Sequence, residues 1–142
     1  CDIRLAGTSA RFAESFLRVG LVSGDGGAWF LPRAVGLSKA YEMTFTGDFV
    51  DAAQALATGL VSRVVDDERL LAEAMELARR IASQPRHALR LSKRLIRDSQ
   101  RIDLAASLEM ASSMQALAQH TSDHREAMAA IAEKRSPRYE GH

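Results

Sequence analysis

The sequence predicts the α/β fold class, with a short α/β segment followed by a helical region. Two observations indicate this division. β-Branched stretches and all but one of the nine glycines are confined to residues 1–65. From residue 66 onward, apolar side chains instead recur at helical spacing. We therefore divide the chain into an α/β segment, residues 1–65, and a helical region, residues 66–142. With 142 residues and 46% hydrophobic content, the chain is long enough to bury a core.

The α/β segment begins with short strands that lead into a glycine-rich loop. Residues 3–5 predict a first strand, and the Gly-Thr-Ser sequence at 7–9 predicts a turn. Residues 17–21 alternate between apolar and other side chains, which predicts a second strand. After the loop, residues 29–36 are expected to form a short helix or turn, in which Pro32 is tolerated only in the first turn.

Two helices and a strand complete this segment. Residues 37–46 are predicted to form a helix that ends at a glycine. Asp51 and Gln54 have the spacing of a capping box, in which each side chain accepts a backbone N–H bond from the other residue. The helix that they open is expected to end at Gly59, and the β-branched residues 60–65 then predict a strand.

The helical region is predicted to contain four helices. They are expected over residues 66–83, 85–99, 104–118 and 123–134. Asp123 and Glu126 have capping-box spacing at the start of the last helix. Because the alanine-rich helices need a surface on which to bury their apolar faces, either the domain core or a second subunit must supply it.

Composition and charge exclude several classes of partner. The net charge is +1, so no global charge points to nucleic acid or an anionic membrane. No apolar run approaches the roughly 18 residues that a membrane-spanning helix needs. The single cysteine, Cys1, excludes an internal disulfide and fits a reducing compartment. We therefore expect a cytoplasmic protein that binds neither nucleic acid nor membrane.

Two further patterns are candidate binding sites. Six basic residues recur at helical spacing: Arg86, Arg90, Lys93, Arg94, Arg97 and Arg101. They can contact phosphates or form a solvated, salt-bridged face, which is the commoner arrangement. His120 and His124 are four residues apart, but a turn is expected between them and no third ligand is evident, so we expect no metal site.

The glycine-rich loop is the strongest candidate for a functional site. Gly24, Gly26 and Gly27 surround one carboxylate, Asp25, and the only tryptophan, Trp29, follows. If a helix starts near the last two glycines, its first N–H groups point at a ligand beside the loop, which suits an anion or a developing oxyanion. Asp25 is then either the N-cap of this helix or a carboxylate at the mouth of the site.

Eight short stretches carry a resemblance that covers essentially the whole chain. They are Cys1-Asp2-Ile3-Arg4, Ala10-Arg11-Phe12, Gly20-Leu21-Val22, Gly24-Asp25-Gly26-Gly27, Leu31-Pro32-Arg33-Ala34-Val35-Gly36, Thr46-Gly47-Asp48, Gly59-Leu60-Val61-Ser62-Arg63-Val64-Val65 and Glu133-Lys134-Arg135. In order and spacing they resemble the crotonase family, also called the enoyl-CoA hydratase/isomerase family. The resemblance implies the end of a crotonase-type ββα spiral core followed by a helical trimerisation region. It also implies the C-terminal half of a subunit that assembles as a homotrimer or a dimer of trimers.

The resemblance also implies a chemistry. Family members bind acyl-CoA thioesters, and they need no cofactor besides the coenzyme A of the substrate. They hold the thioester carbonyl in a hole of two backbone N–H donors, which stabilises an enolate-like intermediate. Both donors are implied to precede Cys1, so residues 1–142 alone are expected to be inactive.

The acidic residues depart from the family pattern. The second glutamate of family hydratases corresponds to Phe16, which cannot transfer a proton. Glu14 lies two residues earlier, and on a strand it would share the face of Phe16 but stand too far back to replace that glutamate. Some family isomerases and dehalogenases carry a carboxylate at the position of Gly24, one residue before Asp25. Asp25 and, after it, Glu14 are therefore the candidate catalytic residues. The residues expected to contact substrate are Phe16, Gly24, Gly26, Gly27 and Trp29.

One residue near the C-terminus is a candidate for coenzyme A binding. Lys134 corresponds to a family lysine that reaches the nucleotide end of coenzyme A. A family aromatic three residues earlier is Ile131 here, so adenine stacking is expected to be absent at that position. The alternative is an exposed lysine favoured by the dipole at a helix end.

These observations predict an acyl-CoA enzyme that acts as a hydratase or an isomerase on an enoyl-CoA through an oxyanion-stabilised enolate. One alternative is a catalytically altered family member that serves as an acyl-CoA-binding or assembly subunit. Another is a different crotonase-type reaction, such as thioester hydrolysis. Coenzyme A binding is expected in each case, so turnover distinguishes them.

Overall fold

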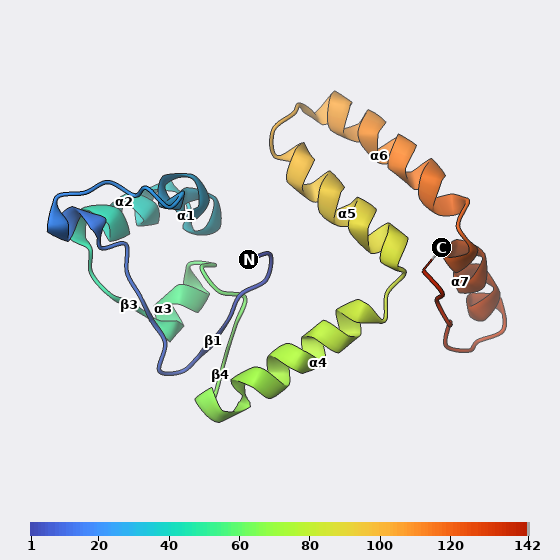
Figure 1. The fold of residues 1–142 in the computed structure, drawn as a ribbon, viewed down its shortest axis with the longest axis horizontal. Helices are drawn as coiled ribbons and strands as arrows, with labels where there is room; N and C mark the ends of the chain where they lie inside the picture. The colour runs from blue at the N-terminus through green and yellow to red at the C-terminus, as the bar shows by residue number, and fades with distance from the viewer. Residues whose placement is uncertain (142) are drawn as a thin grey trace. The chain divides into compact units, whose positions relative to one another are not determined.

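A computed structural model describes residues 1–141, which divide into two compact units (Figure 1). The first unit is Cys1–Glu76 and the second begins at Leu77, so the division falls inside helix α4 (Leu70–Ala82). Within the described residues the strands are short and lie in the first unit, and the rest is mostly helical. The predicted α/β class is confirmed at this level, whereas the domain boundary at residue 65 stays a prediction. None of the described helices is long and apolar enough to cross a membrane.

Two short strand pairs tie the first unit together. Strand β1 (Leu5–Gly7) pairs in parallel with β4 (Arg63–Val65), and β2 (Arg11–Phe12) pairs antiparallel with β3 (Val50–Asp51). A parallel pair needs a long crossover, which the helices between β1 and β4 provide. The remaining elements of this unit are the 3-10 helices η1 (Phe16–Val19) and η2 (Asp67–Arg69), the helices α1 (Gly27–Val35), α2 (Leu37–Thr46) and α3 (Ala52–Ala57), and the first part of α4.

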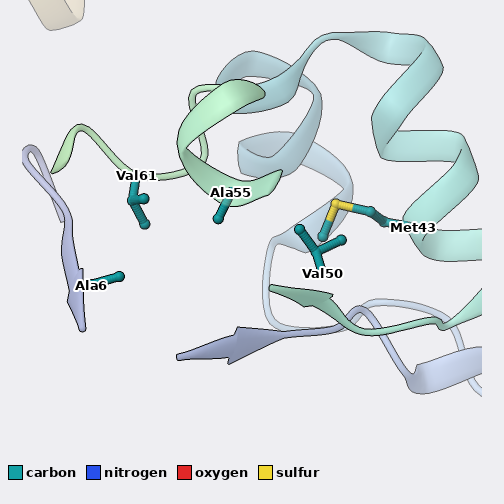
Figure 2. Packing of buried hydrophobic residues seen from close by; sticks show 5 residues of the cluster. All are labelled: Ala6, Met43, Val50, Ala55 and Val61. Carbon is teal, nitrogen blue, oxygen red and sulfur yellow. The ribbon is translucent and has the colours of Figure 1, made fainter. Parts of the chain in front are cut away.

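A small apolar core joins these elements (Figure 2). Its buried members are Ala6, Met43, Val50, Ala55 and Val61, which come from β1, α2, β3, α3 and the segment before β4. Leu31 and Val35 of α1 are partly buried against this cluster. Because apolar contact is the main force that holds a short helix in place, the core fixes α1 and with it the glycine loop at its start.

The local signals around α2 and α3 are confirmed. Helix α2 ends at Gly47, which has a left-handed φ of 64°. The Asp51 carboxylate accepts the N–H of Gln54 at 2.8 Å, and the Gln54 side chain accepts the N–H of Asp51 at 3.2 Å. This is the predicted capping box, and it places the start of α3 directly after β3.

Two predictions near the loop are wrong. The alternating residues 17–21 do not form a strand, because the chain makes the 3-10 helix η1 and turns at Gly20, which has a φ of 72°. Leu17 and Val19 are exposed there rather than facing a sheet. Helix α1 begins at Gly27, a start that the glycine loop allowed but two residues before the range 29–36, so Pro32 is its sixth residue and the expected place of Pro32 in the first turn is wrong. The missing N–H of Pro32 removes one bond of a helix that ends three residues later.

The second unit contains α5 (Arg86–Ser99), α6 (Leu104–Gln119) and α7 (Ser122–Ala132). Helices α5 and α6 lie side by side as a hairpin (Figure 1). The Asp103 carboxylate caps α6 by accepting the N–H of Ala106 at 2.9 Å. Acidic and basic residues of α5 pair on its surface, with Arg94 and Arg97 both 3.3 Å from Asp98.

The predicted capping role of Asp123 is wrong. The N-cap of α7 is Thr121, whose hydroxyl accepts the N–H of His124 at 3.2 Å. Asp123 is instead buried, and its carboxylate accepts the N–H groups of Glu140 at 2.8 Å and of Gly141 at 3.1 Å. The chain after α7 therefore turns back along this helix, as Figure 1 shows.

Candidate active site

The glycine loop leads directly into the first turn of α1. Gly26 has a φ of 94°, in the left-handed region that glycine adopts without strain, and its carbonyl accepts the N–H groups of Trp29 and Phe30 at 2.9 and 3.0 Å. The Asp25 carboxylate accepts the N–H of Gly27 at 2.8 Å. Asp25 thus satisfies one of the free amides of the helix start, as a cap would, although Gly26 holds the N-cap position.

Glu14 also reaches the start of this helix. Its carboxylate accepts a hydrogen bond from the hydroxyl of Ser23. A Cβ placed on Gly27 would lie 2.9 and 3.1 Å from the two Glu14 carboxylate oxygens and 3.1 Å from the Asp25 carboxylate. The two candidate catalytic carboxylates therefore converge on Gly27, and the absence of a side chain at this position leaves room for both.

The expected placement of Glu14 is wrong. It does not share a strand face with Phe16, because β2 ends at Phe12 and Phe16 begins η1. Glu14 is half-buried and lies in the connection between these elements. Because it is not part of a strand, its side chain can turn toward the glycine loop. No signal in the spacing indicated this contact, since it depends on the chain leaving the sheet after Phe12.

The other predicted contact residues lie around this point with different exposure. Phe16 is half-buried, whereas Gly24 is exposed, with open space where a side chain would stand. Trp29 is 48% exposed, and the Arg33 guanidinium lies 3.3 Å from the centre of its ring. Arg33 also donates to the Trp29 carbonyl at 2.9 Å. Sequence reasoning missed this cation–π pair, although the four-residue spacing on a helix indicates it.

Two cavities meet at Gly27. The first, of about 450 Å³, is lined by residues that include Arg4, Asp25, Phe30, Leu31 and Arg33. The second, of about 260 Å³, lies between α1 and α2 and is mostly apolar. Its lining includes Leu31, Leu37, Ala40, Tyr41 and Phe45. The first cavity combines charged residues with apolar ones and the second is mostly apolar, which suits a ligand that has both characters.

Lys134 belongs to the second unit and follows the end of α7. It is exposed, so it is accessible to a ligand. Within residues 1–141, no group of three or more His, Cys, Asp or Glu side chains is arranged to hold a metal ion.

Comparisons with known proteins agree on one relationship. The chain matches the family model described as enoyl-CoA hydratase/isomerase over residues 1–142. It is 38% identical over 140 residues to the 1,2-epoxyphenylacetyl-CoA isomerase of Escherichia coli strain K12, covering 99% of this chain and 53% of that protein. It is 34% identical over 139 residues to the crotonyl-CoA hydratase of Syntrophomonas wolfei, covering 98% of this chain and 54% of that protein.

A solved structure gives the same result in three dimensions. The crystal structure of an enoyl-CoA hydratase from Bacillus anthracis superposes with a TM-score of 0.97 at 36% sequence identity. The superposition covers 100% of this chain and 55% of that one. The chain therefore spans about half the length of the curated relatives and the solved structure that it matches.

Proposed function

Because the chain belongs to the enoyl-CoA hydratase/isomerase family, also called the crotonase family, we propose that it serves an enzyme that acts on an enoyl-CoA thioester. The observation that carries this proposal is the convergence of the Glu14 and Asp25 carboxylates on Gly27. Proton transfer next to a thioester carbonyl needs a base that stays within reach of the substrate carbon. These two side chains are held at one point by hydrogen bonds from Ser23 and Gly27.

Asp25 is the proposed proton-transferring residue. Asp25 lines the cavity of about 450 Å³, whereas Phe16, at the position of the second hydratase glutamate, carries no titratable group. The carboxylate would take a proton from the carbon beside the thioester carbonyl and leave an enolate. As the double bond moves into conjugation with the carbonyl, the γ-carbon takes up a proton, so that one proton leaves carbon 2 and one arrives at carbon 4 of the acyl chain. The two backbone donors that stabilise the enolate oxygen are proposed to come from outside residues 1–142.

Isomerisation is the reaction that these residues favour over hydration. Hydration needs an activated water as well as a proton donor, for which family hydratases use two glutamates. A double-bond shift needs only that one proton leaves and one returns, which a single carboxylate can manage. Phe16 removes one of the two hydratase glutamates, whereas Asp25 stays available. The relatives include one named as an isomerase and one named as a hydratase, so a turnover assay is needed to assign the reaction.

The two cavities provide for different parts of the substrate. We assign the mostly apolar cavity between α1 and α2 to the acyl chain, because its lining buries hydrocarbon without leaving polar groups unpaired. Lys134 is proposed to contact a phosphate at the nucleotide end of coenzyme A. Assembly as a trimer or a dimer of trimers, a cytoplasmic location and the need for no further cofactor stay predictions.

The test is a steady-state assay of the full-length protein with crotonyl-CoA and with a 3-enoyl-CoA, followed by the absorbance of the conjugated thioester. A gain with the 3-enoyl-CoA is expected, and Asp25→Asn is expected to reduce it by about 100-fold or more. Glu68→Gln, an exposed acid in η2, is the matched control and should change little.

Each of the remaining outcomes assigns a different function. Loss of absorbance with crotonyl-CoA would establish hydration despite Phe16. Silence with both substrates, in a protein that binds coenzyme A, would replace this proposal by a different crotonase-type reaction, such as thioester hydrolysis, or by the binding-subunit alternative. Unchanged turnover in Asp25→Asn would remove Asp25 from the mechanism.

A further inference from the structure

Lys134 has an unusual backbone conformation. Its φ is 55°, in the left-handed region, and no other non-glycine residue within 1–141 has a positive φ. A side chain with a Cβ is disfavoured there, and glycine is the usual occupant. Backbone strain of this kind is concentrated at functional sites, where the surrounding structure holds it in place.

The strained residue terminates α7. The N–H of Lys134 donates to the Ile131 carbonyl at 3.2 Å, and the N–H of Arg135 donates to the Ala130 carbonyl at 3.0 Å. These are the two bonds of a Schellman motif, in which the left-handed position is normally glycine. Glycine at position 134 would form the same bonds without strain, so the backbone bonds of the helix end do not require a lysine, although the helix dipole favours a cation there.

The residues after Lys134 form what we call the C-terminal strap, residues 135–141, and its first half is bound to Glu126. The Arg135 guanidinium donates to both Glu126 carboxylate oxygens, at 2.6 and 2.9 Å. The backbone N–H of Arg138 donates to the same carboxylate at 2.8 Å. The hydrogen bonds from Arg135, with the one from Arg138, lower the pKa of Glu126 to about 2. Glu126 therefore stays ionised and attached to the strap at neutral pH.

The second half of the strap is bound to Asp123. This side chain is only 2% exposed, and it accepts the N–H groups of Glu140 and Gly141. The strap also touches α5, because a Cβ on Gly141 would lie 3.1 Å from Cδ of Arg86. Asp123 and Glu126 lie three residues apart on α7, so one turn of this helix holds both halves of the strap.

The lysine side chain itself is left available. Lys134 is exposed, and within residues 1–141 its ammonium group makes no hydrogen bond or ion pair. Its neighbours on both sides are fixed, by α7 before it and by Arg135 after it. An exposed cation on a backbone held from both sides is preorganised for an anionic ligand, because less freedom is lost when the ligand binds.

We propose that Asp123 and Glu126 are positioning residues for Lys134: by holding the C-terminal strap on α7 they fix the left-handed backbone from which the Lys134 ammonium meets a phosphate of coenzyme A. This inference rests on the coenzyme A contact proposed above for Lys134. Asp123 and Glu126 are negatively charged and cannot attract a phosphate themselves. Their contribution to phosphate binding is indirect, through the backbone of Lys134.

The test is a double-mutant cycle on coenzyme A binding by the full-length protein, measured by calorimetry. Lys134→Ala is expected to weaken binding about tenfold, the loss of one charge-assisted hydrogen bond. Glu126→Gln and Asp123→Asn are expected to weaken it less and to speed tryptic cleavage after Arg138, because the strap opens. If Glu126 acts through Lys134, Glu126→Gln should cause no further loss of coenzyme A affinity in the Lys134→Ala background. If Glu126→Gln weakens binding by destabilising the protein, it should lower the affinity in that background too. Glu109→Gln, an exposed acid of α6, is the control and should change neither readout.

Two results would overturn the inference, and they are distinguishable. If Lys134→Ala leaves coenzyme A affinity unchanged, the proposed contact fails and the inference fails with it. If Lys134→Ala weakens binding but Glu126→Gln opens the strap to trypsin without changing affinity, the contact stands and the positioning role alone is wrong. If Asp123→Asn prevents folding, the test rests on Glu126→Gln, which keeps the shape of the side chain.

Discussion

The two units of the molecule use a pair of acidic side chains in opposite ways. At the start of α1, the Glu14 carboxylate accepts a bond from Ser23 and the Asp25 carboxylate accepts one from Gly27. On α7, Glu126 accepts three hydrogen bonds from the C-terminal strap, and Asp123 accepts the N–H groups of Glu140 and Gly141, the latter shared between its two oxygens. A carboxylate saturated with donors holds structure, whereas one with free lone pairs can take up a proton. The first pair is therefore suited to proton transfer, and the second pair to holding the C-terminal strap in place.

The largest effect on the first pair should come from Gly27→Ala. The added Cβ would lie 2.9 Å from one Glu14 oxygen and 3.1 Å from Asp25, so at least one carboxylate must move. A displacement of about 1 Å at a catalytic group can cost on the order of 100-fold in turnover, and we expect a loss of that order with little change in melting temperature. The assay with enoyl-CoA substrates and a thermal melt measure the two quantities.

Gly7→Ala is the counterpart of this variant away from the loop. There an added Cβ would overlap the Asp67 carboxylate, at 1.9 Å, so stability rather than turnover should fall. If Gly27→Ala lowers the melting temperature as Gly7→Ala does and spares turnover, the convergence of carboxylates at Gly27 is structural.

For the second pair, Asp123→Ala should lower stability. The substitution leaves the N–H groups of Glu140 and Gly141 without their acceptor at a buried position, which costs about 2 kcal/mol. Denaturant unfolding of the full-length protein measures the change. Glu109→Ala, on the exposed surface of α6, is the control and should stay within about 0.5 kcal/mol of the parent. An Asp123→Ala variant as stable as this control would contradict the clamping role.

The smallest effect concerns the pH dependence of the strap. The pKa of Glu126 is lowered to about 2 from its ordinary value of 4.5 by the hydrogen bonds from Arg135 and Arg138. A lowered pKa means that the contribution to stability is complete above pH 4.5 and is lost as the pH falls toward 2. An NMR titration of the Glu126 carboxyl should give a midpoint near 2, and Arg135→Ala should return it toward 4.5. A midpoint near 4.5 in the parent protein would contradict the ion pair.

Local signals in the sequence predicted much of the fold, because their partners lie within four residues. The capping box of Asp51 and Gln54, the left-handed glycine at the end of α2 and a helix start at Gly27 each depend on neighbouring residues alone. The strand predicted over residues 17–21 failed because alternation indicates a sheet face only where a neighbouring strand exists. Here Gly20 turns the chain before one can form.

The candidate site was predicted only in part for the same reason. The loop and Asp25 were evident from glycine spacing, but the approach of Glu14 to Gly27 depends on a chain reversal across η1. Asp123 is the clearest case of a contact that sequence spacing did not predict. Its spacing to Glu126 indicates a helix cap, but the N–H groups that it accepts lie 17 and 18 residues later. Sequence spacing does not distinguish a local acceptor from one that serves a distant segment.

The central claim is that the Asp25 carboxylate moves a proton beside the thioester carbonyl. The most direct measurement is the exchange of the α-protons of a saturated acyl-CoA in D₂O, followed by NMR with the full-length protein at saturating substrate. With the parent protein and with the Glu68→Gln control, the acyl-CoA should incorporate deuterium at its α-carbon. Asp25→Asn should slow this exchange by about 100-fold or more. Equal exchange in the parent protein and in Asp25→Asn would contradict the claim.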